Sequence, residues 1–215
     1  MTREEKAIHG LLYADGSYES FPVYYLSREW EYYPDALLTP EDDLDKYYFR
    51  YISIGEYGGM ELGNSGRSPY GSGTYRLKIM LPAEQHTYGL YLPEIFSAYT
   101  LYLNEEKVCS QGNPDQTHYK DLIGNKEISF TASGTVHITI IATNYSHIYS
   151  GITYPPAFGT VTAIQKYLST RLFISGITLA AIFLFSACSL FFFCRLKHKN
   201  ALIFTILCGL FFVIS

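Results

Sequence analysis

The stretch Gly89–Asn113, GLYLPEIFSAYTLYLNEEKVCSQGN, indicates an all-β fold. Together with Tyr88 it holds three short segments that are typical of strands: Tyr88–Leu92, Ala98–Leu103 and Lys107–Ser110. A loop that begins with a proline separates the first two, and a tight turn at Asn104–Glu106 separates the last two. Short segments punctuated in this way predict an antiparallel sheet.

Two longer segments on either side alternate with a period of two, which predicts half-buried strands. In Thr74–Leu81 the positions expected to face the core are Tyr75, Leu77, Ile79 and Leu81. In Thr135–Tyr145 they are Val136, Ile138, Ile140 and Ala142. The residues between them, such as Arg76, Lys78, His137 and Thr139, are expected to face outward.

Further short strands are expected at Val23–Leu26, Trp30–Tyr33, Tyr48–Ile54, Glu127–Thr131 and Thr160–Ile164. About ten short strands separated by turn residues predict an all-β jelly roll or β-sandwich, here over residues 1–168. One helical turn is expected to interrupt them, because Thr39 can cap it and Pro40 suits the first helical position.

The remainder of the chain is expected to be α-helical and to lie in a membrane. Residues 172–194 carry no charge, and a helix of that length spans roughly 35 Å, enough to cross a bilayer. Residues 201–215 are predicted to begin a second transmembrane helix, cut short by the end of the chain. The basic loop between them, residues 195–200, is predicted to be cytoplasmic, which places residues 1–170 outside the cell membrane of a multi-pass protein.

Charge and cysteine content narrow the classes of partner. All 20 Asp and Glu residues lie before residue 171, so the β part is strongly acidic and nucleic acid is not an expected partner. A lipid bilayer is an expected partner. The sequence does not decide whether the chain forms a homodimer. Cys109 is the one cysteine outside the apolar runs, so no disulfide is expected within the β part. The start, MTREEKAIHG, does not read as a secretory signal, so an export signal is expected further upstream.

No catalytic or metal motif is found in the sequence, and no cofactor is expected. The acidic run Glu41, Asp42, Asp43 and Asp45 could bind calcium, but a helix cap explains the same residues and is favoured. Glu29 and Glu31 would share one face of a strand and could form a glycosidase-like pair of carboxylates. A solvated pair is the favoured interpretation. The chain is therefore not expected to be an enzyme.

Loop placement predicts a ligand site. If the strands alternate in direction, four loops meet at one end: Pro69–Gly73, Pro93–Ser97, Gln111–Thr117 and Asn144–Gly151. Loops on a rigid β scaffold commonly bind ligands. The candidate ligand residues are Tyr70, Glu94, Gln111, Asn113, Asp115, Asn144, His147 and Tyr149. The 21 tyrosines of the chain make sugar stacking a plausible chemistry at such a site.

The segments Tyr75–Arg76, Leu90–Tyr99 and the hairpin residue Asn104 resemble the extracellular jelly roll of bacterial seven-transmembrane receptors with diverse intracellular signalling modules (7TM-DISM). Arg28–Asp42 and Ile138–Gly159 are similar to other parts of that family, and the resemblance covers most of residues 11–215. Two positions differ from the family pattern: Glu105 replaces a glycine, and Ser150–Gly151 replaces a glycine pair.

The resemblance implies a galactose-binding-like jelly roll that binds a carbohydrate or related small ligand outside the cell. It also implies further membrane helices and a cytoplasmic output domain that the chain does not contain. The sequence therefore predicts the sensory module of a membrane receptor. The alternative is a membrane-tethered carbohydrate-binding module, or an accessory domain of a glycosidase, without a signalling role.

Overall fold

A computed structural model describes residues 2–3, 7–14, 18, 21–55, 60, 68–197 and 199–214. The chain divides into two compact units, residues 1–164 and residues 165–215. The first unit holds all the strands and the first turn of a long helix.

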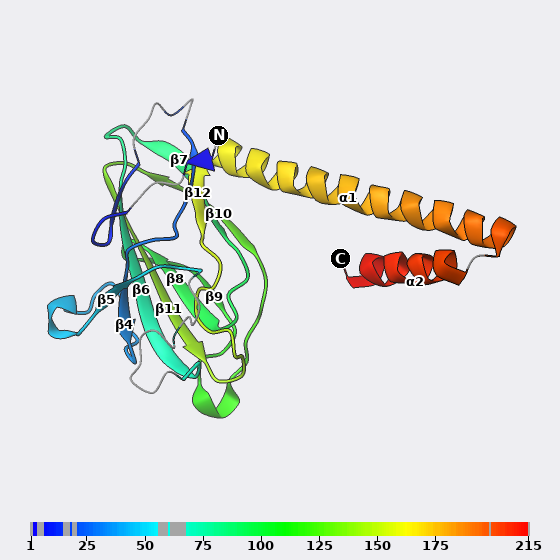
Figure 1. Cartoon of the computed structure of the whole chain (residues 1–215). Helices are drawn as coiled ribbons and strands as arrows, with labels where there is room; N and C mark the ends of the chain where they lie inside the picture. The colour runs from blue at the N-terminus through cyan, green and yellow to red at the C-terminus, as the bar shows by residue number, and fades with distance from the viewer. Residues whose placement is uncertain are drawn as a thin grey trace. The chain divides into compact units, whose positions relative to one another are not determined.

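The first unit is a sandwich of two β-sheets, which confirms the predicted β-sandwich (Figure 1). The five-stranded sheet has the order β1 (Thr2–Arg3), β3 (Val23–Tyr25), β12 (Ala157–Thr160), β7 (His86–Leu92) and β10 (Lys126–Ala132). The seven-stranded sheet has the order β5 (Arg50–Ile52), β4 (Trp30–Pro34), β6 (Gly71–Met80), β11 (Thr135–Asn144), β8 (Ala98–Leu103) and β9 (Glu106–Gln111), with β2 (Leu11–Tyr13) parallel to β6. The sequence did not predict β1 and β2.

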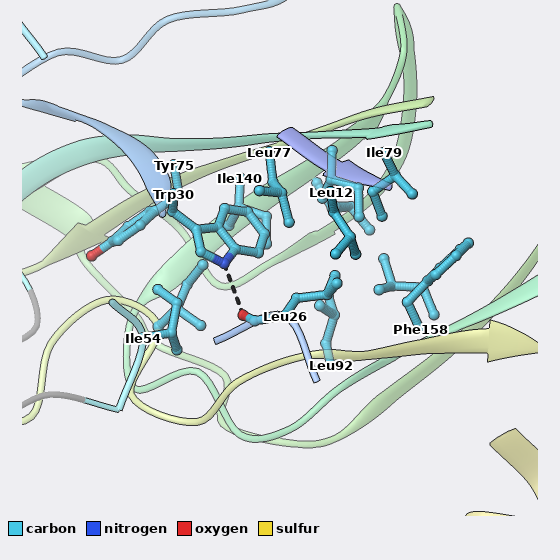
Figure 2. Close-up of a cluster of buried hydrophobic side chains, with 14 of the residues drawn as sticks. Leu12, Leu26, Trp30, Ile54, Tyr75, Leu77, Ile79, Leu92, Ile140 and Phe158 are labelled. Carbon is cyan, nitrogen blue, oxygen red and sulfur yellow. Dashed lines mark hydrogen bonds between the residues drawn. The ribbon is translucent and has the colours of Figure 1, made fainter. Parts of the chain in front are cut away.

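The core lies between the sheets and follows the alternation in the sequence. The predicted inward residues of β6 and β11 are all buried, and Ile79, Val136, Ile138 and Ile140 have no exposed surface. Trp30 of β4 is also fully buried, and its indole Nε1 donates a hydrogen bond to the Leu26 carbonyl at 2.8 Å (Figure 2). Burial of these large side chains is the main stabilising contribution to the sandwich.

The hairpin turn between β8 and β9 depends on Asn104. Its backbone is left-handed, with φ of +55°, a conformation that asparagine tolerates better than most residues. Its side-chain oxygen accepts a hydrogen bond from the backbone N–H of His137 on β11 at 2.9 Å. Asn104 therefore fixes both the turn and the position of the neighbouring strand.

The strand predicted at Thr160–Ile164 is wrong beyond its first residue, because helix α1 (Val161–Leu196) begins at Val161. The Thr160 hydroxyl accepts a hydrogen bond from the Ala163 N–H at 3.2 Å, as a helix N-cap does. The β-branched residues Val161, Thr162 and Ile164 favoured a strand in the sequence. The hydrogen bond from the Ala163 N–H to Thr160 instead stabilises the first turn of a helix.

The helical turn predicted at Thr39 and Pro40 is also wrong. The Asp42 carboxylate accepts hydrogen bonds from the backbone N–H and the hydroxyl of Thr39, at 2.7 and 2.8 Å, but these close a turn rather than a helix. These bonds hold the pKa of Asp42 below its ordinary value. A 3₁₀ helix, η2 (Leu44–Lys46), follows instead. A second 3₁₀ helix, η4 (Gln116–His118), lies between β9 and β10.

Two helices form the rest of the chain, α1 and α2 (Lys199–Ile214). The stretch Val161–Arg195 of α1 is long and apolar enough to cross a membrane, by length and composition. Its apolar side chains are exposed, including Leu172, Phe173 and Phe183. The predicted span 172–194 lies inside α1, and α2 begins two residues before the predicted second span. That α2 belongs to a second transmembrane helix stays a prediction.

Candidate functional site

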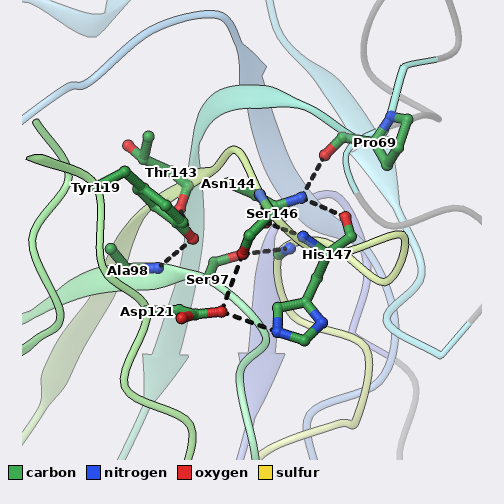
Figure 3. A network of polar contacts seen from close by, with 10 residues as sticks. Pro69, Ser97, Ala98, Tyr119, Asp121, Thr143, Asn144, Ser146 and His147 are labelled. Atoms are coloured by element: carbon green, nitrogen blue, oxygen red, sulfur yellow. Dashed lines mark hydrogen bonds and ion pairs between the residues drawn. The ribbon is translucent and has the colours of Figure 1, made fainter. Parts of the chain in front are cut away.

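Four loops converge at the end of the sandwich where β11 finishes, and direct contacts link them (Figure 3). Asn144 contacts the Pro69 carbonyl, Gly151 contacts Ser97, and His147 contacts Asp121. We call this region, residues 68–70, 93–97, 112–125 and 145–156, the loop end. The predicted convergence is therefore confirmed, with two loops, 112–125 and 145–156, longer than expected.

Asn144 holds two of these loops in place from a fully buried position. Its side-chain nitrogen donates to the carbonyls of Pro69 and His147, at 2.8 and 2.7 Å. Its side-chain oxygen accepts from the backbone N–H groups of Ser146 and His147, at 3.3 and 3.1 Å. Every hydrogen-bonding position of the amide is used, so Asn144 organises the loop end and has no group left for a ligand.

A contact between His147 and Asp121 links the β9–β10 loop to the β11–β12 loop. His147 Nε2 lies 2.8 Å from Asp121 Oδ2, and the Ser146 hydroxyl donates to the same oxygen at 3.0 Å. Beside them the Tyr119 hydroxyl accepts from the Ala98 N–H and donates to the Thr143 carbonyl. Burial raises the pKa of Tyr119, which keeps this hydroxyl protonated and able to donate.

Aromatic side chains surround Phe96 on the surface of the loop end. The Phe96 ring centroid lies 5.7 Å from that of His147, 6.2 Å from that of Tyr149 and 6.3 Å from that of Tyr154. Tyr149 and Tyr154 are 55% and 53% exposed. Exposed rings suit a ligand with C–H faces, which a ring can cover. Asp121, which contacts His147, can accept hydrogen bonds from the hydroxyl groups of such a ligand. We call Phe96, His147, Tyr149 and Tyr154 the ring cluster.

The other predicted site residues fall into two groups. Gln111 is buried: with its amide oriented so that both groups are paired, it donates to the Leu122 carbonyl and accepts from Lys126 Nζ. Asn113 and Asp115 stabilise local turns. The Asn113 side chain accepts a hydrogen bond from the Asp115 N–H, and the Asp115 side chain accepts one from the Thr117 N–H. Tyr70, Glu94 and Tyr149 are exposed and His147 is half-buried, so these four are placed to contact a ligand.

Sequence reasoning missed Phe96, Asp121 and Tyr154. Phe96 lies inside a predicted loop, and its ring could have been selected as the aromatic residue of that loop. Asp121 and Tyr154 lie beyond the predicted loop boundaries, so no local signal pointed to them. Among the described residues, no three His, Cys, Asp or Glu side chains converge as metal ligands do, and this applies to the acidic run at residues 41–45.

The loop end continues through one short strand into helix α1. The loop that carries Tyr149 and Tyr154 leads directly into β12, and β12 ends at the helix cap Thr160. Gly151, in this loop, has φ of +67° and donates its N–H to the Ser97 hydroxyl at 2.8 Å. A left-handed backbone with no space for a Cβ against Tyr75 requires glycine here.

The first turn of α1 rests on two glycines of the five-stranded sheet. Gly159 of β12 lies directly opposite Gly89 of β7. A Cβ on Gly89 would lie 3.1 Å from Ile164 Cγ1, and a Cβ on Gly159 would lie 3.6 Å from Ala163 Cβ. Ile164 has no exposed surface. We call Gly89 and Gly159 the helix seat. The absence of a Cβ at Gly89 lets Ile164 approach the sheet closely, whereas a Cβ at Gly159 would make an ordinary contact with Ala163.

No family model and no curated protein matches the chain. Among solved structures it is similar to a GH2 β-galacturonidase from Eisenbergiella tayi bound to galacturonate, with a TM-score of 0.48, 13% identity and 64% of this chain covered. It is likewise similar to a β-glucuronidase from Faecalibacterium prausnitzii, with a TM-score of 0.49, 15% identity and 64% covered. The chain spans 24% and 31% of the length of those enzymes, and the likeness extends to nothing beyond fold.

Proposed function

We propose that this chain is the ligand-sensing module of a multi-pass membrane receptor of the seven-transmembrane kind that its sequence resembles, with a galactose-binding-like jelly roll outside the cell. The loop end binds a carbohydrate or a related small ligand, and an output domain outside this chain carries the response. No catalytic step is assigned to the chain itself.

One observation carries the proposal: the loop bearing Tyr149 and Tyr154 continues through four residues of β12 into α1. A ligand that stacks on these rings and draws the loop toward Phe96 would pull on β12, and so on the helix seat. Such a ligand changes the helix only if it binds two arrangements of the loop with different affinity. A tethered binding module, the alternative, shares the ring cluster but needs no response at α1.

Ligand binding is tested with the full chain in a detergent that has no sugar head group. Glucose, galactose, N-acetylglucosamine and glucuronate are the probes, and thermal unfolding is the measurement. A sugar that binds only the folded chain stabilises it by about 2.7 kcal/mol at a hundred times its dissociation constant. We expect Tyr149→Ala to weaken binding about tenfold, equivalent to roughly 1.4 kcal/mol.

Tyr13→Ala is the matched control, because Tyr13 on β2 is 63% exposed and pairs with Met80 at the other end of β6. It should bind the sugar as the unmodified chain does. Equal losses in the two variants, or no stabilisation by any of the four sugars, would argue against a carbohydrate site at the loop end.

The helix seat gives a separate test of the response at α1. Gly89→Leu is expected to displace the first turn of α1 and to lower stability by about 1–3 kcal/mol, as overpacking does. Amide hydrogen exchange of residues 161–164 should become faster. Gly124→Leu is the control, since no atom lies within 4 Å of a Cβ there. If bound sugar leaves the exchange of residues 157–164 unchanged in the unmodified chain, the tethered-module alternative is favoured.

A further inference from the structure

A row of side chains crosses the outer face of the seven-stranded sheet, on the side away from the core. The strand registers place each member directly opposite the next, from β5 through β4, β6, β11 and β8 to β9. The row consists of Tyr51, Glu31, Arg76, Thr139, Tyr102 and Lys107. Thr139, which the sequence predicted to face outward, lies in the row but is buried, and the other five are half-buried or exposed. We call it the outer row. Residues opposite each other in a sheet point to the same face, so six side chains form one strip across six strands.

The outer row joins ring, acid, base and hydroxyl groups. At its acidic end the Tyr33 hydroxyl donates to Glu31 Oε2 at 3.2 Å, and on the next strands Arg76 Nη2 lies 3.3 Å from His137 Nδ1. Burial raises the pKa of Glu31, and burial followed by the charges of Arg76 and Lys78 lowers the pKa of His137. Burial also raises the pKa of Tyr33 to about 12, so its hydroxyl stays a donor. The Glu31 carboxylate can accept several more hydrogen bonds than the one Tyr33 supplies.

The backbone around Glu31 is held in an uncommon conformation. His9 and Glu29 are non-glycine residues with φ of +50° and +58°, and the His9 N–H donates to Glu29 Oε2 at 3.2 Å. Because β4 begins at Trp30, Glu29 lies outside it, and the predicted placement of Glu29 and Glu31 on one strand face is wrong. Gly10, with φ of +73°, leaves room for the carboxyl, since a Cβ there would lie 2.8 Å from Glu31 Oε1. Left-handed residues of this kind gather at binding sites more than elsewhere.

Aromatic rings border the acidic end of the outer row. The His9 ring stacks on Tyr51 with centroids 5.3 Å apart, and Phe49 lies 5.4 Å from both Tyr33 and Tyr51. Tyr51 and Phe49 remain 39% and 38% exposed. Four residues in the stretch Tyr47–Tyr51 are exposed aromatics, a density that folding of the sandwich alone does not require.

We propose that the outer row is a second binding site, for a linear glycan that lies across the strands with one sugar ring on Tyr51. The chemistry of the row favours this occupant: the ring covers C–H faces, Glu31 accepts from hydroxyl groups, and Arg76 donates to ring or hydroxyl oxygens. The row spans six strands, or about 24 Å at the usual strand spacing, so it suits a chain of sugars better than a single one. The site is independent of the loop end.

The test measures binding of cellohexaose and of chitohexaose to the full chain by calorimetry, in the same sugar-free detergent. At least one hexasaccharide should bind at least tenfold more tightly than its monosaccharide. Tyr51→Ala and Glu31→Gln should each weaken that binding tenfold or more. The controls Tyr13→Ala and Glu127→Gln, exposed positions on β2 and β10, should leave it unchanged, with far-UV circular dichroism confirming that all variants fold.

The variant Tyr149→Ala distinguishes binding at the outer row from binding at the loop end. We expect it to leave the binding of the hexasaccharide unchanged while it weakens that of a monosaccharide. The proposal is overturned if neither hexasaccharide binds, if Tyr51→Ala behaves like Tyr13→Ala, or if Tyr149→Ala alone abolishes binding of the hexasaccharide.

Discussion

Replacing Trp30 with alanine is expected to lower the free energy of unfolding by about 3–5 kcal/mol. Trp30 is the only tryptophan of the chain and the largest side chain with no exposed surface. Its removal leaves a cavity between the two sheets, among Leu26, Ile54 and Leu77 (Figure 2). It also leaves the buried Leu26 carbonyl without the indole donor, which adds a cost of about 1–3 kcal/mol if no other donor replaces it.

Trp30→Phe separates the two contributions. Phenylalanine keeps most of the ring volume but cannot donate to Leu26, so it should lose only part of the stability lost by the alanine variant. Tryptophan fluorescence disappears in both variants. The near-UV circular dichroism of the tyrosines is therefore the measurement, followed through thermal unfolding. A loss below 1 kcal/mol for Trp30→Ala would show that the sheets close over the cavity.

The alternation of β6 and β11 made the sandwich predictable, because a period of two assigns each residue to one face. The core residues Leu77 and Ile138 and the outward Arg76 and His137 follow from it directly. The convergence of four loops followed from strand direction alone. Local rules were therefore sufficient wherever a strand was long and one of its faces was buried.

Local rules failed where a neighbouring element decides the structure. Thr160–Ile164 is rich in β-branched residues, yet it forms a helix whose first turn is capped by Thr160 and rests on Gly89, 75 residues before Ile164 in the chain. The ring cluster could not be predicted for a similar reason. Phe96 and Tyr154 lie on separate loops, and only the fold brings their rings together.

The outer row illustrates a third case. In the sequence, Arg76 was an ordinary outward-facing residue, Glu31 was one of a pair interpreted as solvated, and Tyr51 was only part of an expected strand. What makes them a candidate site is the register of β5, β4 and β6, which sets the three side by side. Register between strands distant in sequence is not contained in the pattern of any single strand.

Replacing Asn144 with alanine is expected to lower the free energy of unfolding by about 2–4 kcal/mol, because four hydrogen bonds of a fully buried amide are lost. The β11–β12 loop should open, so the amides of residues 145–151 should exchange faster. Asn113→Ala is the matched control, since Asn113 is exposed and its side chain accepts one local hydrogen bond. It should change stability by less than about 0.5 kcal/mol, as surface substitutions usually do.

Asn144→Asp decides between the two roles that Asn144 can have. Aspartate keeps the acceptor for Ser146 and His147 but faces the carbonyls of Pro69 and His147 with a negative charge, so a loop-organising role predicts a loss of stability at least as large as for alanine. Affinity for a sugar should then fall together with stability. If both variants keep their stability and lose only affinity, Asn144 contacts the ligand directly, as the sequence predicted, and the loop end has an arrangement with ligand that differs from the one described. Stability and affinity measured on the same variants thus distinguish a residue that holds the loops in place from one that contacts the ligand.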